Sequence, residues 1–474
     1  QGLIASAPET TPSIMSACEL TSALHVNSPA DEVAEEAPLP RSFELPDPAN
    51  PGDVHPDPEP WNWSEFLKML GPGLMTCLAD TDGPCLQTAA SSGVQYKYGL
   101  VVVQICLIPV LYAAQELTVR LSLVTKDGIT GLIRRRFGKF WAWFACTLHV
   151  LMCIQQQMGE FGCISQFATE VWGVQKWWPP LLYFVMLFLT IVLGHWYFRV
   201  LEILGMCAGS CQLLLIYVML ATRPVFSEFL SGLWEMPFSD MNYNVLMSGN
   251  IGAVIMPWML YYQQSALVQK KVRVSKIAYC RAETKIGACL AQVVMLSIVV
   301  AMGTAAYAGP SAPATGFADI VEAVGPSLGG ELASKWVISI AMVGACGCAS
   351  ICLMVTPIWS ICEIMDWKKD FDYTPREAPG LYSLQVLGLV LAYLMAVFTD
   401  ISSTPTWAIC AQIVNAALIL PVACFLWLLA ADAQILPRKY RLEGAYKWTL
   451  FVVFGVVCLY CAFGTVMTMI SPSP

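Results

Sequence analysis

The sequence predicts an all-α membrane protein, and three features lead to that prediction. Of the 474 residues, 57% are hydrophobic and only 13% are charged, whereas soluble domains carry about 25% charged residues. Apolar segments long enough to cross a bilayer, which takes about 20 residues, recur between polar loops. The basic residues lie mainly in alternate loops, as in polytopic membrane proteins. Together these features exclude an ordinary soluble enzyme.

Eleven transmembrane helices are expected from the apolar segments between polar breaks. They lie near residues 66–94, 99–123, 140–172, 179–196, 201–222, 246–268, 284–307, 335–363, 381–399, 405–431 and 446–470. The loops between them leave no room for a sizeable extramembrane domain. A transporter or channel is therefore favoured, and an enzyme is not expected.

The basic residues give an independent test of this number of spans. With the N-terminus placed in the cytoplasm, only Lys97, Lys176, Arg223 and Lys335 fall on the outer side, so that 26 − 4 = 22 basic residues lie inside. The positive-inside rule then predicts a multi-pass protein of the cell membrane. Its N-terminus is expected in the cytoplasm and its C-terminus outside the cell.

Residues 1–60 differ sharply in composition from the rest of the chain. They hold eleven carboxylates, one basic residue (Arg41) and eleven of the thirty prolines, so their net charge is 1 − 11 = −10 against −8 for the whole chain. Such a segment cannot bury enough apolar surface to fold. We expect a disordered acidic cytoplasmic tail over 1–60 and a transmembrane transporter domain over 61–474. The 19 cysteines have no regular spacing and are expected to be free thiols.

The first expected span contains two carboxylates and a helix-breaking pair. Asp80 and Asp82 lie at mid-membrane, where a charged side chain costs about 2.5–3.5 kcal/mol on insertion scales unless it binds something. Gly83-Pro84 follows at once, and a proline cannot donate a helical hydrogen bond. The helix near 66–94 should therefore unwind beside the carboxylates.

The sixth expected span repeats this device. Pro257 lies inside the apolar helix near 246–268 and frees a backbone carbonyl near Ala253. Secondary transporters build ion sites from discontinuous helices at the midplane. Two breaks five spans apart indicate a five-plus-five inverted repeat with one extra helix, and a substrate site where the breaks meet.

The residues around both breaks match a family. Asp82-Gly83-Pro84-Cys85 resembles the first helix of the NRAMP divalent-metal transporters, and Ala253 to Trp258 resembles their sixth helix. The resemblance implies a LeuT-like fold that works by alternating access. It also implies that Asp82 binds the metal, with Met256 as a sulfur ligand and Ala79 and Ala253 as carbonyl donors. Cys85 occupies the place of the family's asparagine ligand.

Other departures from the family concern proton transfer. Trp258 replaces a histidine, and Gln157 stands for the aspartate of a pair in which Glu160 is retained. Histidine and carboxylates carry protons near neutral pH, so these changes should weaken proton coupling. This combination of residue changes resembles the NRAMP-related magnesium transporters, a branch described as not coupled to protons. His149, elsewhere in the third span, is interpreted as a packing residue.

Several neighbouring residues are candidates for a supporting role. Asp80, Thr81 and Gln157 could hold a hydrated ion through water, and Glu160 could be a proton site or a packing group. Trp258 could gate the cavity or fill it. Gln412, in the tenth span, corresponds to a family glutamine near the metal to within one residue of register.

The main hypothesis is an importer of divalent cations, Mg²⁺ with Mn²⁺ tolerated, that is not proton-coupled. Mg²⁺ keeps part of its water shell, but the sulfurs of Met256 and Cys85 favour softer metals. A proton-coupled Mn²⁺/Fe²⁺ symporter therefore stays open. So does an amino-acid or amine transporter of the same fold, although two aspartates would repel a carboxylate substrate.

The remaining expectations concern cofactors and partners. Mg²⁺ or Mn²⁺ is expected as transported substrate and no cofactor as a resident group. The expected partners are divalent metal ions and the lipid bilayer. Neither a nucleic acid nor an obligate protein partner is inferred from the sequence.

Overall fold

The computed structural model describes residues 59–194, 198–399 and 404–470, and the regular elements in these ranges are helices. Nearly all of the acidic segment 1–60 lies outside the described residues, so the expectation of a disordered tail stays a prediction. The cysteines within the described ranges are free thiols.

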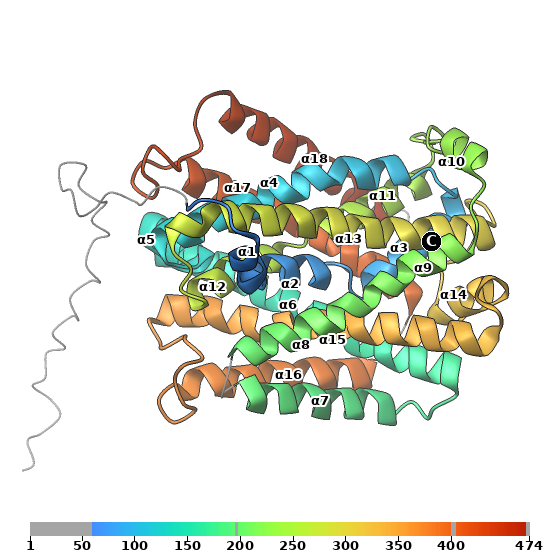
Figure 1. Cartoon of the computed structure of the whole chain (residues 1–474), viewed down its shortest axis with the longest axis horizontal. Helices are drawn as coiled ribbons and strands as arrows, with labels where there is room; N and C mark the ends of the chain where they lie inside the picture. Colours follow the sequence, from blue (N-terminus) through green and yellow to red (C-terminus); the bar gives the residue numbers. More distant parts are fainter. Residues whose placement is uncertain (1–58, 195–197, 400–403, 471–474) are drawn as a thin grey trace, which may run out of the picture. The chain divides into compact units, whose positions relative to one another are not determined.

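The helices follow one another along the chain with short connections (Figure 1). In order they are α1 Trp63–Met69, α2 Pro72–Ala79, α3 Gly83–Tyr96, α4 Val101–Thr125, α5 Ile129–Phe137, α6 Lys139–Trp172, α7 Trp178–Gly194, α8 Phe198–Ser210, the 3₁₀ turn η2 Cys211–Leu213, α9 Leu214–Ala221, α10 Phe226–Gly232, α11 Met241–Val254, α12 Pro257–Gln269, η3 Val274–Lys276, α13 Ile277–Ala305, α14 Phe317–Val324, η4 Pro326–Leu328, α15 Glu331–Met365, α16 Pro379–Thr399, α17 Pro405–Ala431 and α18 Gly444–Ile470.

Each of the eleven expected spans coincides with a helix, a helix with a short 3₁₀ turn, or a broken helix pair. Among the described residues, eight helical stretches are long and apolar enough to cross a membrane. The other three expected positions hold the α2–α3 pair, the 34-residue α6 and the 17-residue α7. The all-helical membrane architecture is confirmed, and the number eleven stays a prediction.

The first break occurs where the sequence predicts it. Helix α2 ends at Ala79, and α3 begins at Gly83 with Pro84 in its first turn. The Asp82 carboxylate caps α3, because its Oδ1 accepts a hydrogen bond from the backbone N–H of Cys85 at 2.9 Å. Asp82 thereby satisfies one of the donors that a helix start leaves unpaired.

The second break lies between α11 and α12. Helix α11 ends at Val254, Met256 precedes α12 in an extended conformation (φ −75°, ψ 123°), and Pro257 is the first residue of α12. Proline is favoured at that position because its missing N–H would have no helical partner there. Both discontinuous helices are therefore confirmed.

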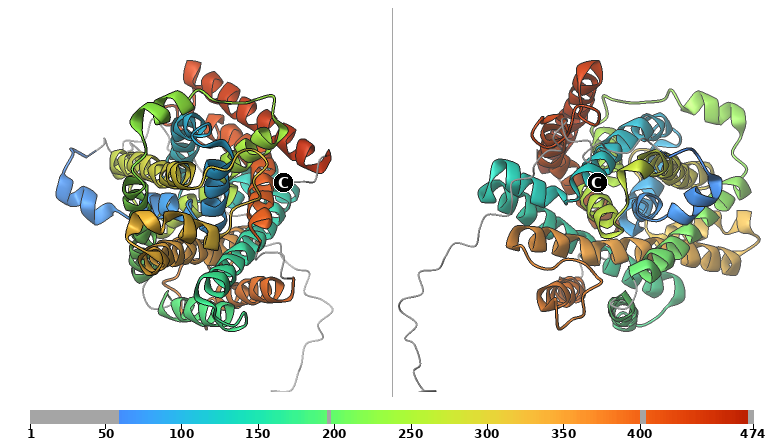
Figure 2. Two further views of the ribbon diagram at one scale, coloured as in Figure 1. Left: turned by 90° about the vertical axis from the view of Figure 1, so that its right-hand side faces the viewer. Right: turned by 60° about the vertical axis from the view of Figure 1, so that its left-hand side comes forward.

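The two broken helices lie inside the bundle, and other helices surround them (Figures 1 and 2). Helices α7 and α16 lie side by side, and α18 packs on α17 and α11. Helices α7, α16 and α18 expose large apolar side chains, among them Leu182, Leu189, Phe398 and Leu459. Apolar faces of this kind suit contact with lipid.

Several ion pairs lie at one end of the bundle. Helices α1, α5 and α12 reach one end, on the left of Figure 1, and α10 and α14 reach the other. Ion pairs join loops at the first end that are distant in sequence: Arg134–Asp366 at 2.5 Å, Lys271–Asp372 at 2.6 Å and Lys369–Asp127 at 3.2 Å. The loops predicted to be cytoplasmic therefore gather at one end.

Candidate metal site

The two helix breaks meet in the middle of the molecule. The thiol of Cys85, on α3, donates a hydrogen bond to the backbone carbonyl of Ala253, on α11, with 3.4 Å between sulfur and oxygen. Ala79, Asp82, Cys85, Ala253 and Met256 are each 0% exposed. Four of the residues that the resemblance assigns to the metal thus border the two breaks, and Ala79 is the last residue of α2. The site is closed to solvent on both sides.

Asp82 accepts hydrogen bonds from neutral groups, and the carboxyl of Glu160 lies beside it. The Oδ2 of Asp82 accepts a hydrogen bond from Gln156 Nε2 on α6 at 2.6 Å, besides the capping bond to its Oδ1. Gln156 Oε1 in turn accepts from Asn415 Nδ2 on α17 at 3.1 Å, and Asn415 also donates to Gln412 Oε1 at 2.9 Å. A chain of amides thus orients the carboxylate without neutralising it.

Glu160 lies beside the same break. Its Oε2 accepts a hydrogen bond from the backbone N–H of Gly83 at 3.4 Å, and its Oε1 is buried without a partner. The packing here is tight, since a Cβ on Gly83 would lie 2.9 Å from both Cys163 Cβ and Cys346 Sγ. Among the described residues, neither Asp82 nor Glu160 forms an ion pair with a basic side chain.

Asp80 and Thr81, in the unwound segment, have different surroundings. Asp80 is 1% exposed, and both of its carboxylate oxygens are buried without a hydrogen-bond partner in the described structure. The Thr81 hydroxyl contacts the side-chain oxygen of Gln212, in η2, and the carbonyl of Leu78. Thr81 therefore faces the fifth span, whereas Asp80 retains a buried carboxylate with no donor.

Gln157 is not at the carboxylate. Its Nε2 donates to Ser350 Oγ on α15 at 2.8 Å, and Ser350 also accepts from the Tyr183 hydroxyl at 2.7 Å. Its neighbour Gln156 contacts Asp82 instead. Consecutive helical residues point about 100° apart. An error of one residue in the predicted register of α6 therefore exchanges the residue that contacts Asp82 with the residue that contacts Ser350.

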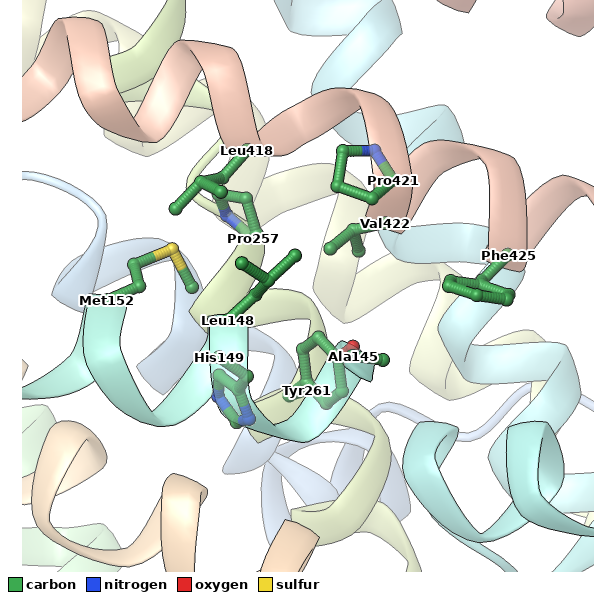
Figure 3. A pocket seen from close by; sticks show the side chains of 10 residues that line it. All are labelled: Ala145, Leu148, His149, Met152, Pro257, Tyr261, Leu418, Pro421, Val422 and Phe425. Carbon is green, nitrogen blue, oxygen red and sulfur yellow. The ribbon is translucent and has the colours of Figure 1, made fainter. Parts of the chain in front are cut away.

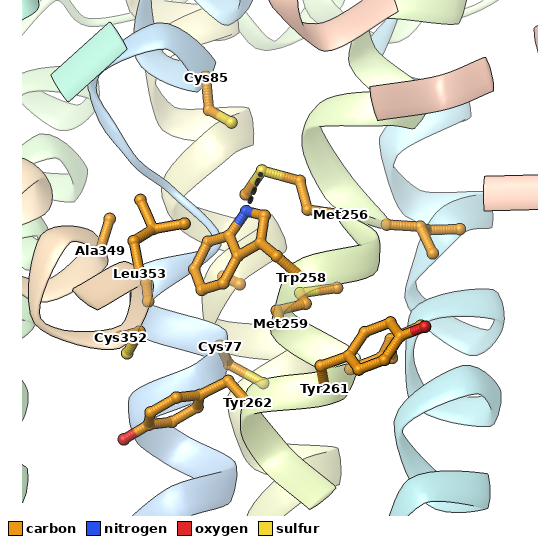
Figure 4. Close-up of a cluster of buried hydrophobic side chains, with 14 of the residues drawn as sticks. Cys77, Cys85, Met256, Trp258, Met259, Tyr261, Tyr262, Ala349, Cys352 and Leu353 are labelled. Carbon is orange, nitrogen blue, oxygen red and sulfur yellow. Dashed lines mark hydrogen bonds between the residues drawn. The ribbon is translucent and has the colours of Figure 1, made fainter. Parts of the chain in front are cut away.

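The Met256 sulfur also has a partner within the protein. The indole Nε1 of Trp258 donates to it across 3.3 Å, and Figure 4 shows this bond beside Cys85. Trp258 is 0% exposed and is among the largest fully buried side chains. It packs with Ala349, Cys352 and Leu353 of α15, which are drawn in the same cluster.

His149 is the only histidine within the described ranges, and it lies apart from the carboxylates. Its ring stacks on Tyr261 with 4.0 Å between centroids, and its Nδ1 bonds Ser360 Oγ at 2.9 Å. Both rings line a small, mostly apolar pocket between α6, α12 and α17 (Figure 3). No described histidine therefore contacts Asp82.

The ligand set is mixed rather than a cluster of ionisable groups. Within the described ranges, no three His, Cys, Asp or Glu side chains are placed to hold one metal ion. The available donors are the Asp82 carboxylate, the Ala253 carbonyl and two sulfurs. Gln156 is a contact of Asp82 that sequence reasoning missed, and its signal was an amide inside an otherwise apolar helix.

Curated relatives of this chain include named metal transporters. It is 27% identical over 258 residues to the divalent metal cation transporter MntH of Chromohalobacter salexigens, which is 53% of this chain and 59% of that one. It is 25% identical over 221 residues to the metal transporter Nramp6 of Arabidopsis thaliana, or 45% of this chain and 41% of that one. The match thus spans about half the length of these relatives.

Solved structures of the same fold are also transporters. A mutant of the Eremococcus coleocola manganese transporter superposes with a TM-score of 0.73 at 15% identity, over 89% of this chain and 92% of that one. MhsT in complex with L-phenylalanine gives 0.58 at 13% identity, over 83% and 98%. The expected LeuT-like fold is confirmed.

The family itself follows from a match over most of the chain. The model of the Natural resistance-associated macrophage protein-like (Nramp) family matches residues 73–467, which include both helix breaks. The relatives found are transporters rather than enzymes, and metal ions are their substrates. The chain belongs to the Nramp family.

Proposed function

We propose that this protein transports divalent metal cations across a membrane by alternating access, with the ion bound beside Asp82. The observation that carries the proposal is a buried carboxylate without a cationic partner, placed where two broken helices meet. A buried charge is costly unless it is paired or binds an ion. A transported cation would supply the missing charge.

We further propose that the ion is Mg²⁺, with Mn²⁺ tolerated, as in the NRAMP-related magnesium transporters. The Gln156 amide contacts Asp82, and Asn415 contacts Gln156 in turn; such groups can bind the water shell that Mg²⁺ retains. The absence of a described histidine at the site and the amide of Gln156 favour transport without proton coupling. We also propose that the N-terminus is cytoplasmic, which the gathering of the basic loops at one end supports.

A proton-coupled Mn²⁺/Fe²⁺ symporter is the second candidate. One observation favours it: Glu160 keeps a buried carboxyl beside the break, and one of its oxygens has no partner. A protonatable group in that position could carry a proton with the metal. Several relatives bear names that refer to divalent metal cations or manganese.

Transport into proteoliposomes tests the proposal. The wild-type protein should admit Mg²⁺ and Mn²⁺ without acidifying the lumen, as followed by an enclosed pH dye. Asp82→Ala should abolish both fluxes, and Asp372→Ala serves as the matched control because that exposed carboxylate pairs with an exposed lysine. Full transport by Asp82→Ala would contradict the site. Lumen acidification coupled to Mn²⁺ entry would favour the symporter.

A further inference from the structure

Two soft ligands border the site, and the protein uses both sulfurs itself. Met256 Sδ accepts a hydrogen bond from the Trp258 indole at 3.3 Å, and Cys85 donates its thiol proton to the Ala253 carbonyl at 3.4 Å. The thiolate, not the thiol, is the metal ligand. The usual soft donors of a transition-metal site are therefore engaged before any ion arrives.

The contact between Trp258 and Met256 follows from the second helix break. Met256 is extended, and Trp258 is the second residue of α12, so the indole returns over the residue that precedes the helix. Both side chains are 0% exposed. Within the described structure the sulfur is the acceptor of the indole N–H.

The energetic consequence concerns any ion that uses the sulfur. An indole N–H is a donor only, and a buried donor left without its acceptor costs about 1–3 kcal/mol. A metal that bound the Met256 sulfur through the lone pair that faces the indole would compete with this hydrogen bond. A metal that binds through oxygen and water would leave the bond intact.

We propose that Trp258 is a specificity-determining residue, which withdraws the Met256 sulfur from the ion and so selects hard cations over soft ones. This inference rests on the proposed function of the same site. Thioether sulfur favours soft metals, whereas Mg²⁺ takes oxygen ligands and retains waters. Trp258 thus acts through Met256 and need not touch the ion.

Trp258→Phe removes the N–H and keeps an aromatic side chain in the cluster. Calorimetric titration of the purified protein with Cd²⁺, the soft probe, and with Mg²⁺ measures the effect. Cd²⁺ affinity should rise by about fivefold or more, which is the size of one released hydrogen bond. Mg²⁺ affinity should stay within about twofold, since oxygen binding does not involve the sulfur.

Met256→Leu supplies the matched control, because it conserves volume and removes only the sulfur. In the wild-type background it should leave Cd²⁺ affinity nearly unchanged. In the Trp258→Phe background it should remove the gain in Cd²⁺ affinity. If Trp258→Phe fails to fold, the Cd²⁺ affinity of the single Met256→Leu variant still tests whether the Met256 sulfur binds the ion.

A Cd²⁺ affinity that falls tenfold in Met256→Leu would overturn the inference, since the sulfur would then ligate despite the indole. Unchanged Cd²⁺ affinity in a folded Trp258→Phe would overturn it as well. In both cases, Mg²⁺ binding that is lost in Asp82→Ala leaves the proposed function standing. Wild-type protein that binds no divalent ion would reject both proposals together.

Discussion

Two groups of buried carboxylates in this protein differ in their partners. One group forms ion pairs with basic side chains, and the other does not. At the centre, Asp82 and Glu160 accept hydrogen bonds from amides and a backbone N–H, and Asp80 has no described partner. At the end of the bundle that carries the basic loops, buried carboxylates such as Glu116 pair with Arg, although the buried Glu283 accepts two backbone N–H groups instead. The same chemical group therefore has basic partners in one region and no basic partner among the described residues in the other.

Each of two carboxylates at that end has one basic partner in its own helix and one from another segment. Glu116 on α4 contacts Arg120 at 2.5 Å and Arg281 on α13 at 2.7 Å. Glu202 on α8 contacts Arg199 at 2.8 Å and Lys270 at 3.4 Å. Each carboxylate has a side-chain exposure of 4% or less. These contacts tie the loops together in the conformation described.

Lys369, in the loop after α15, illustrates the balance at this end. Burial by itself lowers the pKa of its ammonium, but the carboxylates of Glu363 and Asp127 outweigh this and raise the pKa above its ordinary value. The lysine therefore stays charged at physiological pH. Under the proposed function, the paired charges serve structure, and the central carboxylates without a basic partner are where the cation would bind.

The largest expected effect is on stability and concerns a paired carboxylate. Glu116→Gln leaves Arg120 and Arg281 without their anionic partner, and breaking a buried ion pair costs about 3–5 kcal/mol. Thermal unfolding in detergent should show a marked loss of stability. Glu443→Gln, in an exposed pair with Arg441, is the control, because exposed pairs contribute about 1 kcal/mol or less. Equal losses of stability in the two variants would contradict the distinction between buried and exposed ion pairs.

The next effect concerns the amide that orients Asp82. Gln156→Leu removes the hydrogen bond to Oδ2, and losing a group that orients a ligand typically lowers metal affinity by about 10–100-fold. Gln157→Leu, one residue away and bonded to Ser350, is the matched control and should change affinity far less. Calorimetric titration with Mg²⁺ compares them. A larger loss of Mg²⁺ affinity in Gln157→Leu than in Gln156→Leu would favour the sequence-based prediction that Gln157 is the residue at the site.

The smallest effect is expected at Glu160. Glu160→Gln keeps the size and an acceptor for the Gly83 N–H, so Mg²⁺ flux should fall by no more than about threefold if the carboxyl carries no proton. Flux into proteoliposomes at two external pH values provides the measurement. A loss of flux that grows with pH in the wild type but not in the variant would assign Glu160 to proton coupling.

Much of the fold could be predicted from sequence because membrane helices have a strong length signal. The expected span 405–431 has the bounds of α17. The two breaks followed from Gly83-Pro84 and from Pro257, whose chemistry acts locally. Apolar runs also predicted the positions of α6 and α7, although neither helix is among the eight stretches that are both long and apolar enough to cross a membrane.

The finer parts of the site depended on long-range geometry. Which of Gln156 and Gln157 contacts Asp82 depends on the rotation of α6 against α3, and no local pattern fixes that angle. The bond from Trp258 to Met256 depends on the extended backbone at Met256. Sequence alone therefore left Trp258 open between gate and filler.

Thermal unfolding of Asp82→Asn, with and without Mg²⁺, tests most directly whether the central charge is unbalanced until an ion binds. Asn retains the helix cap but carries no charge. Wild-type protein should be stabilised by Mg²⁺, by about 2.7 kcal/mol at a hundredfold excess over its dissociation constant. The variant should match or exceed the ion-free wild type and should not respond to Mg²⁺. A variant as unstable as Glu116→Gln, or one still stabilised by Mg²⁺, would contradict the account.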